Sequence, residues 1–185
     1  VNYVERCGNF TQKGYEYTGA LKILQVILSY DYLWLNIRVK GGAYGCMSGF
    51  RRNGEAFFVS YRDPHLRETL DVYRGIPAYL RDFQADERAM TKYIIGAISS
   101  KDVPLTPQMK GNISTSAYFM GVTEEMMQKE RDQILDAAPE DIRALAEPLE
   151  AVLSKGHICV IGGEEMIGKE KDLFADIKYL TEGKK

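Results

Sequence analysis

The sequence lacks the features of several protein classes. No apolar run approaches the roughly 20 residues that a membrane-spanning helix needs. The formal net charge is −2, so there is no basic excess for binding the phosphates of a nucleic acid. The first residues, VNYVERCGNF, include no starting methionine and no basic segment followed by an apolar one. We therefore expect no membrane and no nucleic acid among the partners, and we expect a fragment of a longer chain.

Cysteine and histidine are scarce. The three cysteines, Cys7, Cys46 and Cys159, form no CxxC pair, which favours free thiols in a reducing compartment, a bacterial cytoplasm or an organelle matrix. His65 lies in DPHLRETLD, which has threonine where a His-x-x-Glu-His zinc motif needs its second histidine. We expect His65 on the surface near a helix start and His157 at a strand edge. Neither predicts a metal site, so we expect no cofactor in these residues.

What the chain does contain is enough for one folded domain. It has 185 residues, of which 45 % are hydrophobic and 27 % charged, so it can bury a core. Alternating residues predict a first strand over 1–7, and Asn53-Gly54 predicts a hairpin between strands at 43–52 and 55–62. HICVIGG, from residue 157, predicts a buried strand. The expected helices lie at 18–28, 31–38, 65–83 (with a kink or break at Pro77), 86–101, 112–120, 123–138 and 140–153.

Two further segments complete the expected fold. The stretch KDVPLTPQMKG, with its two prolines, predicts a loop, and residues from Glu164 to Leu180 predict a last amphipathic stretch. Strands of a small sheet separated by clustered helices are typical of α+β proteins. We therefore expect a single α+β domain over 1–185, with an antiparallel or mixed sheet packed against a layer of helices.

The segment IRVKGGAYGCMSGF, residues 37–50, is the one stretch where residue types favour a site. Arg38 can donate a fork of hydrogen bonds to a carbonyl or carboxylate, and the Tyr44 hydroxyl is a neutral donor. Glycines 41, 42 and 45 remove side chains, so another backbone could approach. The alternative is structural, with Arg38 capping its helix and Tyr44 packing in the sheet. Gly41-Gly42 in either case predicts the helix end.

Residues 14–45, GYEYTGALKILQVILSYDYLWLNIRVKGGAYG, resemble the C-terminal domain of the presequence-protease branch of the pitrilysin/insulinase zinc peptidases. The resemblance extends through the hairpin and, more loosely, to HICVIGG. It implies a much longer parent enzyme with four related α+β domains, in two halves that close around a peptide. It also implies that zinc is bound by His-x-x-Glu-His in the first domain, outside this chain. The last domain of the family contributes an arginine and a tyrosine, which correspond to Arg38 and Tyr44.

The resemblance implies a mechanism for the parent enzyme. Zinc and a glutamate base would activate water to attack a peptide carbonyl, while Tyr44 donates a hydrogen bond to the oxyanion and Arg38 holds a substrate carbonyl. The chain alone would then be an inactive, substrate-binding and catalysis-completing domain. Its partners would be unstructured peptides and the other domains of its own parent chain. Surface that normally meets those domains could lead the fragment to self-associate.

Two other interpretations stay open at this point. Some members of the wider superfamily have lost the zinc motif and act as structural partners of an active subunit, so the chain could be a non-catalytic scaffold. A generic α+β interaction domain with no peptidase history is the third interpretation. Retained Arg38 and Tyr44 favour the active form over a scaffold.

Overall fold

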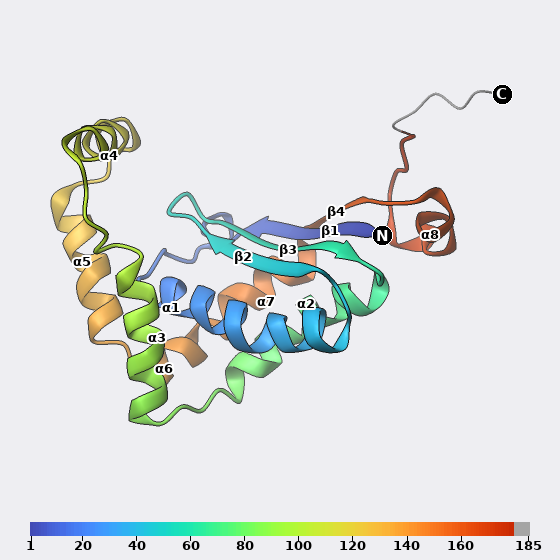
Figure 1. Ribbon diagram of the computed structural model, residues 1–185, viewed down its shortest axis with the longest axis horizontal. Coiled ribbons are helices and arrows are strands. Elements are labelled where there is room, and N and C mark those ends of the chain that lie inside the picture. Colours follow the sequence, from blue (N-terminus) through green and yellow to red (C-terminus); the bar gives the residue numbers. More distant parts are fainter. Residues whose placement is uncertain (180–185) are drawn as a thin grey trace.

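A computed structural model describes residues 1–179, and four antiparallel strands in it form one sheet (Figure 1). Each strand pairs with its neighbour in the order β2-β3-β1-β4. The strands are β1 (Asn2–Asn9), β2 (Gly45–Phe50), β3 (Glu55–Asp63) and β4 (His157–Ile161). The predicted α+β architecture, with an antiparallel sheet against a helical layer, is confirmed.

The helices cover one face of the sheet only. In Figure 1 α1, α2 and α7 run beneath the strands, while α3, α5 and α6 extend this layer past the end of the sheet. The bounds are α1 (Ala20–Ile27), α2 (Arg67–Arg81), α3 (Glu87–Ser99), α4 (Pro107–Met120), α5 (Glu124–Leu135), α6 (Pro139–Ala144), α7 (Ala146–Lys155) and α8 (Glu164–Lys169). No helix in residues 1–179 is long and apolar enough to cross a membrane.

The two faces of the sheet differ in burial. Val4, Ala56 and Phe58 point toward the helices and are fully buried in the core. On the opposite face Tyr3 and Ile161 remain about half exposed. The expectation of a buried strand at HICVIGG was wrong, because β4 is an edge strand in which exposed and half-buried residues alternate. His157 begins this edge strand, as predicted.

Residues 20–40 form one continuous helical rod rather than the two predicted helices. After α1 come two wider, π-helical segments, η2 (Leu28–Tyr32) and η3 (Trp34–Lys40). The expected second N-cap at Ser29 or Asp31 was wrong, because Leu28 and Leu33 on either side keep right-handed helical angles. The Leu33 N–H donates to the Leu28 carbonyl, five residues back, so an extra residue is accommodated in the turn.

Three other expectations need correction. α2 runs unbroken through Pro77. The loop expected over KDVPLTPQMKG ends early, since α4 begins at Pro107, where the Thr106 side chain accepts from the Met109 N–H. The expected amphipathic stretch from Glu164 is helical only in α8 and in one further 3₁₀ turn, Lys171–Leu173, and Leu180 lies outside the described residues.

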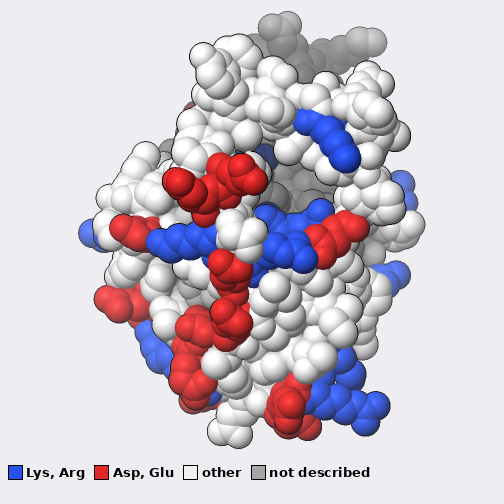
Figure 2. All heavy atoms as spheres, turned by 90° about the vertical axis from the view of Figure 1, so that its left-hand side faces the viewer, with Lys and Arg blue, Asp and Glu red and all other residues white. Residues whose placement is uncertain are grey.

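α4 stands apart from the rest of the molecule. Figure 1 shows it extending beyond the helical layer, and Ala117 is its one buried residue. Its sequence carries a single charge, Lys110, and its C-terminal residues Tyr118 and Phe119 are each more than 80 % exposed. In Figure 2 the upper part of this face is accordingly almost free of charge, whereas acidic and basic side chains alternate across the middle.

Candidate functional site

The turn between η3 and β2 is closed by the backbone. The Gly42 N–H donates to the Arg38 carbonyl (3.0 Å) and the Ala43 N–H donates to the Ile37 carbonyl (3.1 Å). Gly42 has φ +74°, the left-handed conformation common just after a helix. The predicted helix end at Gly41-Gly42 is therefore confirmed. The alternative role of Arg38 as a cap was wrong, because main-chain groups close the helix end.

Arg38 is held by an aromatic ring. Its guanidinium carbon lies 4.1 Å from the centroid of the Trp34 ring, a cation–π arrangement. The two residues are four apart in a segment whose hydrogen bonds span five residues, so they share one face of the rod. No residue in 1–179 forms a hydrogen bond or ion pair with the Arg38 side chain. Its donors are thus oriented but free.

Tyr44 lies at the start of β2 and is 59 % exposed. Its ring centroid is 5.5 Å from that of Tyr61, with the two planes tilted by 57°. The guanidinium carbon of Arg62 lies 5.5 Å from the Tyr44 ring centroid. Within the described part of the chain the Tyr44 hydroxyl has no hydrogen-bond partner. Tyr44 packs on the sheet along one side of its ring, as the structural alternative expected, and more than half of the residue stays exposed.

The structure places Arg38 and Tyr44 at the same end of β2 without joining their side chains. The backbone turn connects the two residues. The Tyr44 N–H also donates to the Arg62 carbonyl on β3 (3.4 Å). Each of the two side chains rests on an aromatic ring of its own. Tyr44 is exposed and Arg38 is half-buried, so their donors can reach another domain or a peptide that covers this surface.

Two glycines of this segment are explained by close contacts within the domain. A Cβ on Gly45 would stand 2.5 Å from the Tyr61 ring, and a Cβ on Gly41 would stand 2.6 Å from the Ile37 carbonyl oxygen. These contacts give both glycines a structural reason, and the approach of another backbone to this segment stays a prediction. Gly45 makes room for Tyr61, and Tyr61 in turn supports Tyr44.

Cys46 follows the turn but is no nucleophile. Burial raises the pKa of its thiol to about 11, and the positive charge of Arg38 opposes this shift only in part. The thiol therefore stays protonated at neutral pH. All three cysteines are free.

The histidines do not build a metal site. His65 is about half exposed before α2, as predicted, with its Nδ1 3.9 Å from the Glu68 carboxylate. His157 lies on a different element, and no group of three or more His, Cys, Asp or Glu side chains within residues 1–179 could hold a metal ion. These donors do not fit zinc.

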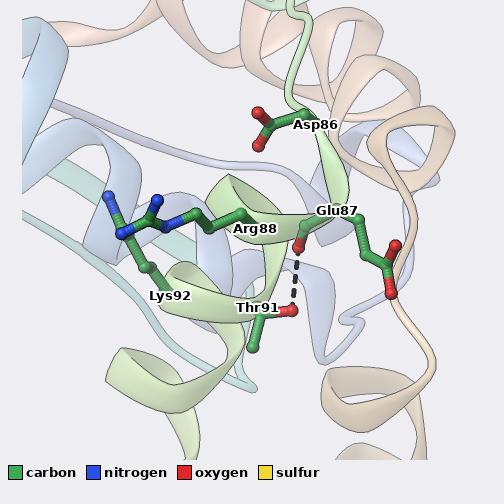
Figure 3. Close-up of a pocket in the computed structure, with 5 residues that line it drawn as sticks. All are labelled: Asp86, Glu87, Arg88, Thr91 and Lys92. Atoms are coloured by element: carbon green, nitrogen blue, oxygen red, sulfur yellow. Dashed lines mark hydrogen bonds between the residues drawn. The ribbon is translucent and has the colours of Figure 1, made fainter.

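One surface hollow lies away from Arg38 and Tyr44. It measures about 580 Å³ beside the N-terminus of α3 and is lined by Asp86, Glu87, Arg88, Thr91 and Lys92. Figure 3 shows that Glu87 points away from Arg88 and Lys92, while the Thr91 hydroxyl donates to the Glu87 carbonyl of its own helix. Nothing in the hollow converges on a ligand.

A family model described as the PreP C-terminal domain matches residues 1–164. The chain belongs to this family. It is 51 % identical to Protein HypA of Clostridium perfringens and 36 % identical to presequence protease 1, chloroplastic/mitochondrial, of Arabidopsis thaliana. Each match covers 96 % of this chain but only 18 % and 17 % of those relatives, so the chain spans less than a fifth of their length.

Solved structures agree in fold. A crystal structure from Bordetella pertussis Tohama I has a TM-score of 0.68 at 14 % identity, with coverage of 88 % of this chain and 94 % of that one. The peptidase M16 inactive domain from Pseudomonas fluorescens has a TM-score of 0.60 at 14 % identity, covering 86 % and 40 %. The resemblance found in the sequence, to the C-terminal domain of presequence-protease-type pitrilysin peptidases, is confirmed.

Three residues around the site were missed by sequence reasoning. Trp34 could have been found from its spacing of four before Arg38, which places two helical side chains together. Tyr61 and Arg62 gave no such signal, because β3 was expected to end regularly at Asp63-Pro64. Only the strand pairing shows that their backbone is irregular.

Proposed function

We propose that residues 1–185 form the last domain of a four-domain zinc-dependent oligopeptidase, and that this domain completes a catalytic site whose metal is bound by another domain. The family match and the unpaired donors of half-buried Arg38 and exposed Tyr44 support the proposal. The partners would be unstructured peptide substrates and the other domains of the parent chain. The free cysteines support a reducing compartment, a bacterial cytoplasm or an organelle matrix.

The proposal depends on one observation: two hydrogen-bond donors at one end of β2 are each packed against an aromatic ring. Arg38 is oriented by Trp34, and Tyr44 by Tyr61, while neither donor is consumed by a partner in residues 1–179. A donor that is fixed in place and unpaired suits the stabilisation of charge that develops only in the transition state. Tyr44 would donate to the oxyanion of the attacked peptide carbonyl, and Arg38 would hold a neighbouring substrate carbonyl.

The test is the change Tyr44→Phe in the full-length protein. Loss of one oxyanion donor lowers kcat on the order of 10² to 10³-fold. The zinc content should stay at the wild-type value, because no described residue of this domain fits a metal. Tyr118→Phe is the matched control, since it removes the hydroxyl of an 82 % exposed tyrosine on α4. An unchanged kcat in Tyr44→Phe would remove Tyr44 from the mechanism.

The same assay separates the active form from a non-catalytic scaffold. A scaffold predicts no metal-dependent peptide hydrolysis by the full-length protein in the first place. The isolated 185-residue chain should hydrolyse no fluorogenic peptide with or without added zinc. Zinc-dependent turnover by the isolated chain would contradict the proposed division of the site between domains.

A further inference from the structure

We propose that Arg62, which lies over the ring of Tyr44, forms a subsite for a carboxylate of the bound peptide. The proposal rests on the function proposed above and names a substrate feature that this domain would recognise. A carboxylate can come from an acidic side chain or from the C-terminus of the peptide, and the experiment below separates these two sources.

Arg62 occupies a bulge in the sheet. Along the pairing of β1 with β3, Asn2 lies opposite Asp63 and Tyr3 lies opposite Tyr61, so Arg62 has no partner on β1. A bulge of this kind bends a strand and re-aims a side chain, and bulges are frequent beside active sites. The extra residue turns the Arg62 guanidinium toward Tyr44, with 5.5 Å between its central carbon and the ring centroid.

The backbone of Arg62 is strained. Its φ is +51°, and among residues 1–179 it is the one non-glycine residue with a positive φ. An arginine gains nothing locally from this conformation, whereas glycine or asparagine would adopt it with less strain. Strain of this type persists when the surrounding structure imposes it, and it is concentrated at functional sites.

The residues on either side of Arg62 impose its strained backbone conformation. On one side Asp63 is fully buried, and its carboxylate accepts from the Ser60 and Thr69 hydroxyls (2.5 and 2.7 Å) and from the His65 N–H (2.9 Å). On the other side Tyr61 lies against Gly45 and Tyr44. The residue between these two fixed neighbours is left exposed, with its carbonyl bound by the Tyr44 N–H.

The hydrogen-bond donors of the Arg62 guanidinium are also free within the described residues. Within the described residues its side chain forms no hydrogen bond and no ion pair, in contrast to Arg51, Arg52 and Arg67, which all bind carboxylates. The nearest carboxylate in sequence, Asp63, is buried and already occupied by three donors. A planar guanidinium with free donors matches the two oxygens of a carboxylate.

The experiment uses the full-length enzyme and pairs of peptides that differ by one carboxylate. One pair exchanges glutamate for glutamine near the cleaved bond, and the other compares a free with an amidated C-terminus. The variants are Arg62→Gly and Arg62→Asn, which remove the guanidinium while tolerating a left-handed backbone. Arg51→Ala is the matched control, because Arg51 lies 5.9 Å from the Phe57 ring centroid at the other end of β2.

We expect both Arg62 variants to raise KM about tenfold or more for the carboxylate member of one pair, with kcat nearly unchanged and the amide member unaffected. The pair that responds identifies the source of the carboxylate. Thermal stability should stay equal or rise, because the strain is relieved. Arg51→Ala should leave both peptides unaffected.

Two results would overturn the subsite. One is wild-type enzyme that does not distinguish the members of either pair. The other is a uniform loss of kcat for all peptides in the Arg62 variants, which would make Arg62 a positioning residue for Tyr44 only. Failure of the proposed function gives a different pattern, in which Tyr44→Phe is fully active as well.

Discussion

The contact between Gly45 and Tyr61 gives a sharp test of how Tyr44 is supported. A methyl group added at Gly45 would meet three atoms of the Tyr61 side chain at 2.5 Å, so the ring must move. The Tyr61 ring packs on Tyr44, and displacing it by even about 1 Å should displace the Tyr44 hydroxyl by a similar distance. We therefore expect Gly45→Ala to reduce activity without unfolding the protein.

The expected magnitudes follow from three terms. Displacing a packed ring costs about 1–3 kcal/mol of the free energy of unfolding. Replacing glycine by alanine returns about 0.5–1 kcal/mol by restricting the unfolded chain. The net loss is then about 1 kcal/mol, which lowers Tm by roughly 2–4 °C in a protein of this size. A misplacement of about 1 Å at a catalytic group costs on the order of 10² in rate, which we expect in kcat.

Gly49→Ala is the matched control for this test. A Cβ at Gly49, on the same strand, would displace the Phe57 ring as Gly45→Ala displaces Tyr61. Its effect on Tm should be comparable, measured on the 185-residue chain by thermal melting. Its kcat, measured in the full-length enzyme, should match wild type, since Phe57 supports no proposed catalytic group. Equal kcat losses in the two variants, or none in Gly45→Ala, would refute the reasoning.

Three further predictions concern stability, reactivity and dynamics. Asp63→Ala leaves two buried hydroxyls and one partly buried backbone N–H unpaired and should destabilise the chain by about 3 kcal/mol, seen as a lower denaturation midpoint with an unchanged slope; a loss under 1 kcal/mol would contradict this account. Iodoacetamide at pH 8 should label exposed Cys159 well before Cys46, because burial raises the pKa of Cys46 to about 11, so its thiolate forms only as the pH approaches that value; equal labelling rates would count against it. Amides of α4 should exchange with solvent much faster than those of α2 in the isolated chain, because α4 buries a single residue; comparable protection by mass spectrometry would contradict this.

The parts of the fold that follow regular patterns could be predicted from the sequence. Asn53-Gly54 predicted the hairpin, and Gly54 does adopt a positive φ of +89° there. Thr106-Pro107 was an equally clear helix start, with a capping side chain and a proline at the first position. The pair Pro104 and Pro107 was instead interpreted as the sign of a loop. That error came from weighing composition above capping chemistry.

The irregular parts could not be predicted in the same way. The widened turns of η2 and η3 leave the apolar spacing near that of an ordinary helix, and polar residues at 29 and 31 then resemble a cap. The bulge at Arg62 depends on the pairing of Tyr61 with Tyr3 and of Asp63 with Asn2, on a strand far away in sequence. Arg38 and Tyr44 were identified by resemblance, whereas their aromatic supports became visible only once the chain was folded.

The π-helical segment of residues 28–40 also limits where this domain can tolerate deletions and insertions. Each residue of a helix turns the chain by about 100°, so a helix that closed up by losing one residue would rotate everything after it by that angle. Arg38 would leave the side of the rod that faces β2, although no residue of the site had been substituted. Single-residue deletions in this rod should therefore be far more damaging than most point substitutions, and natural length variation is expected in the surface loops instead.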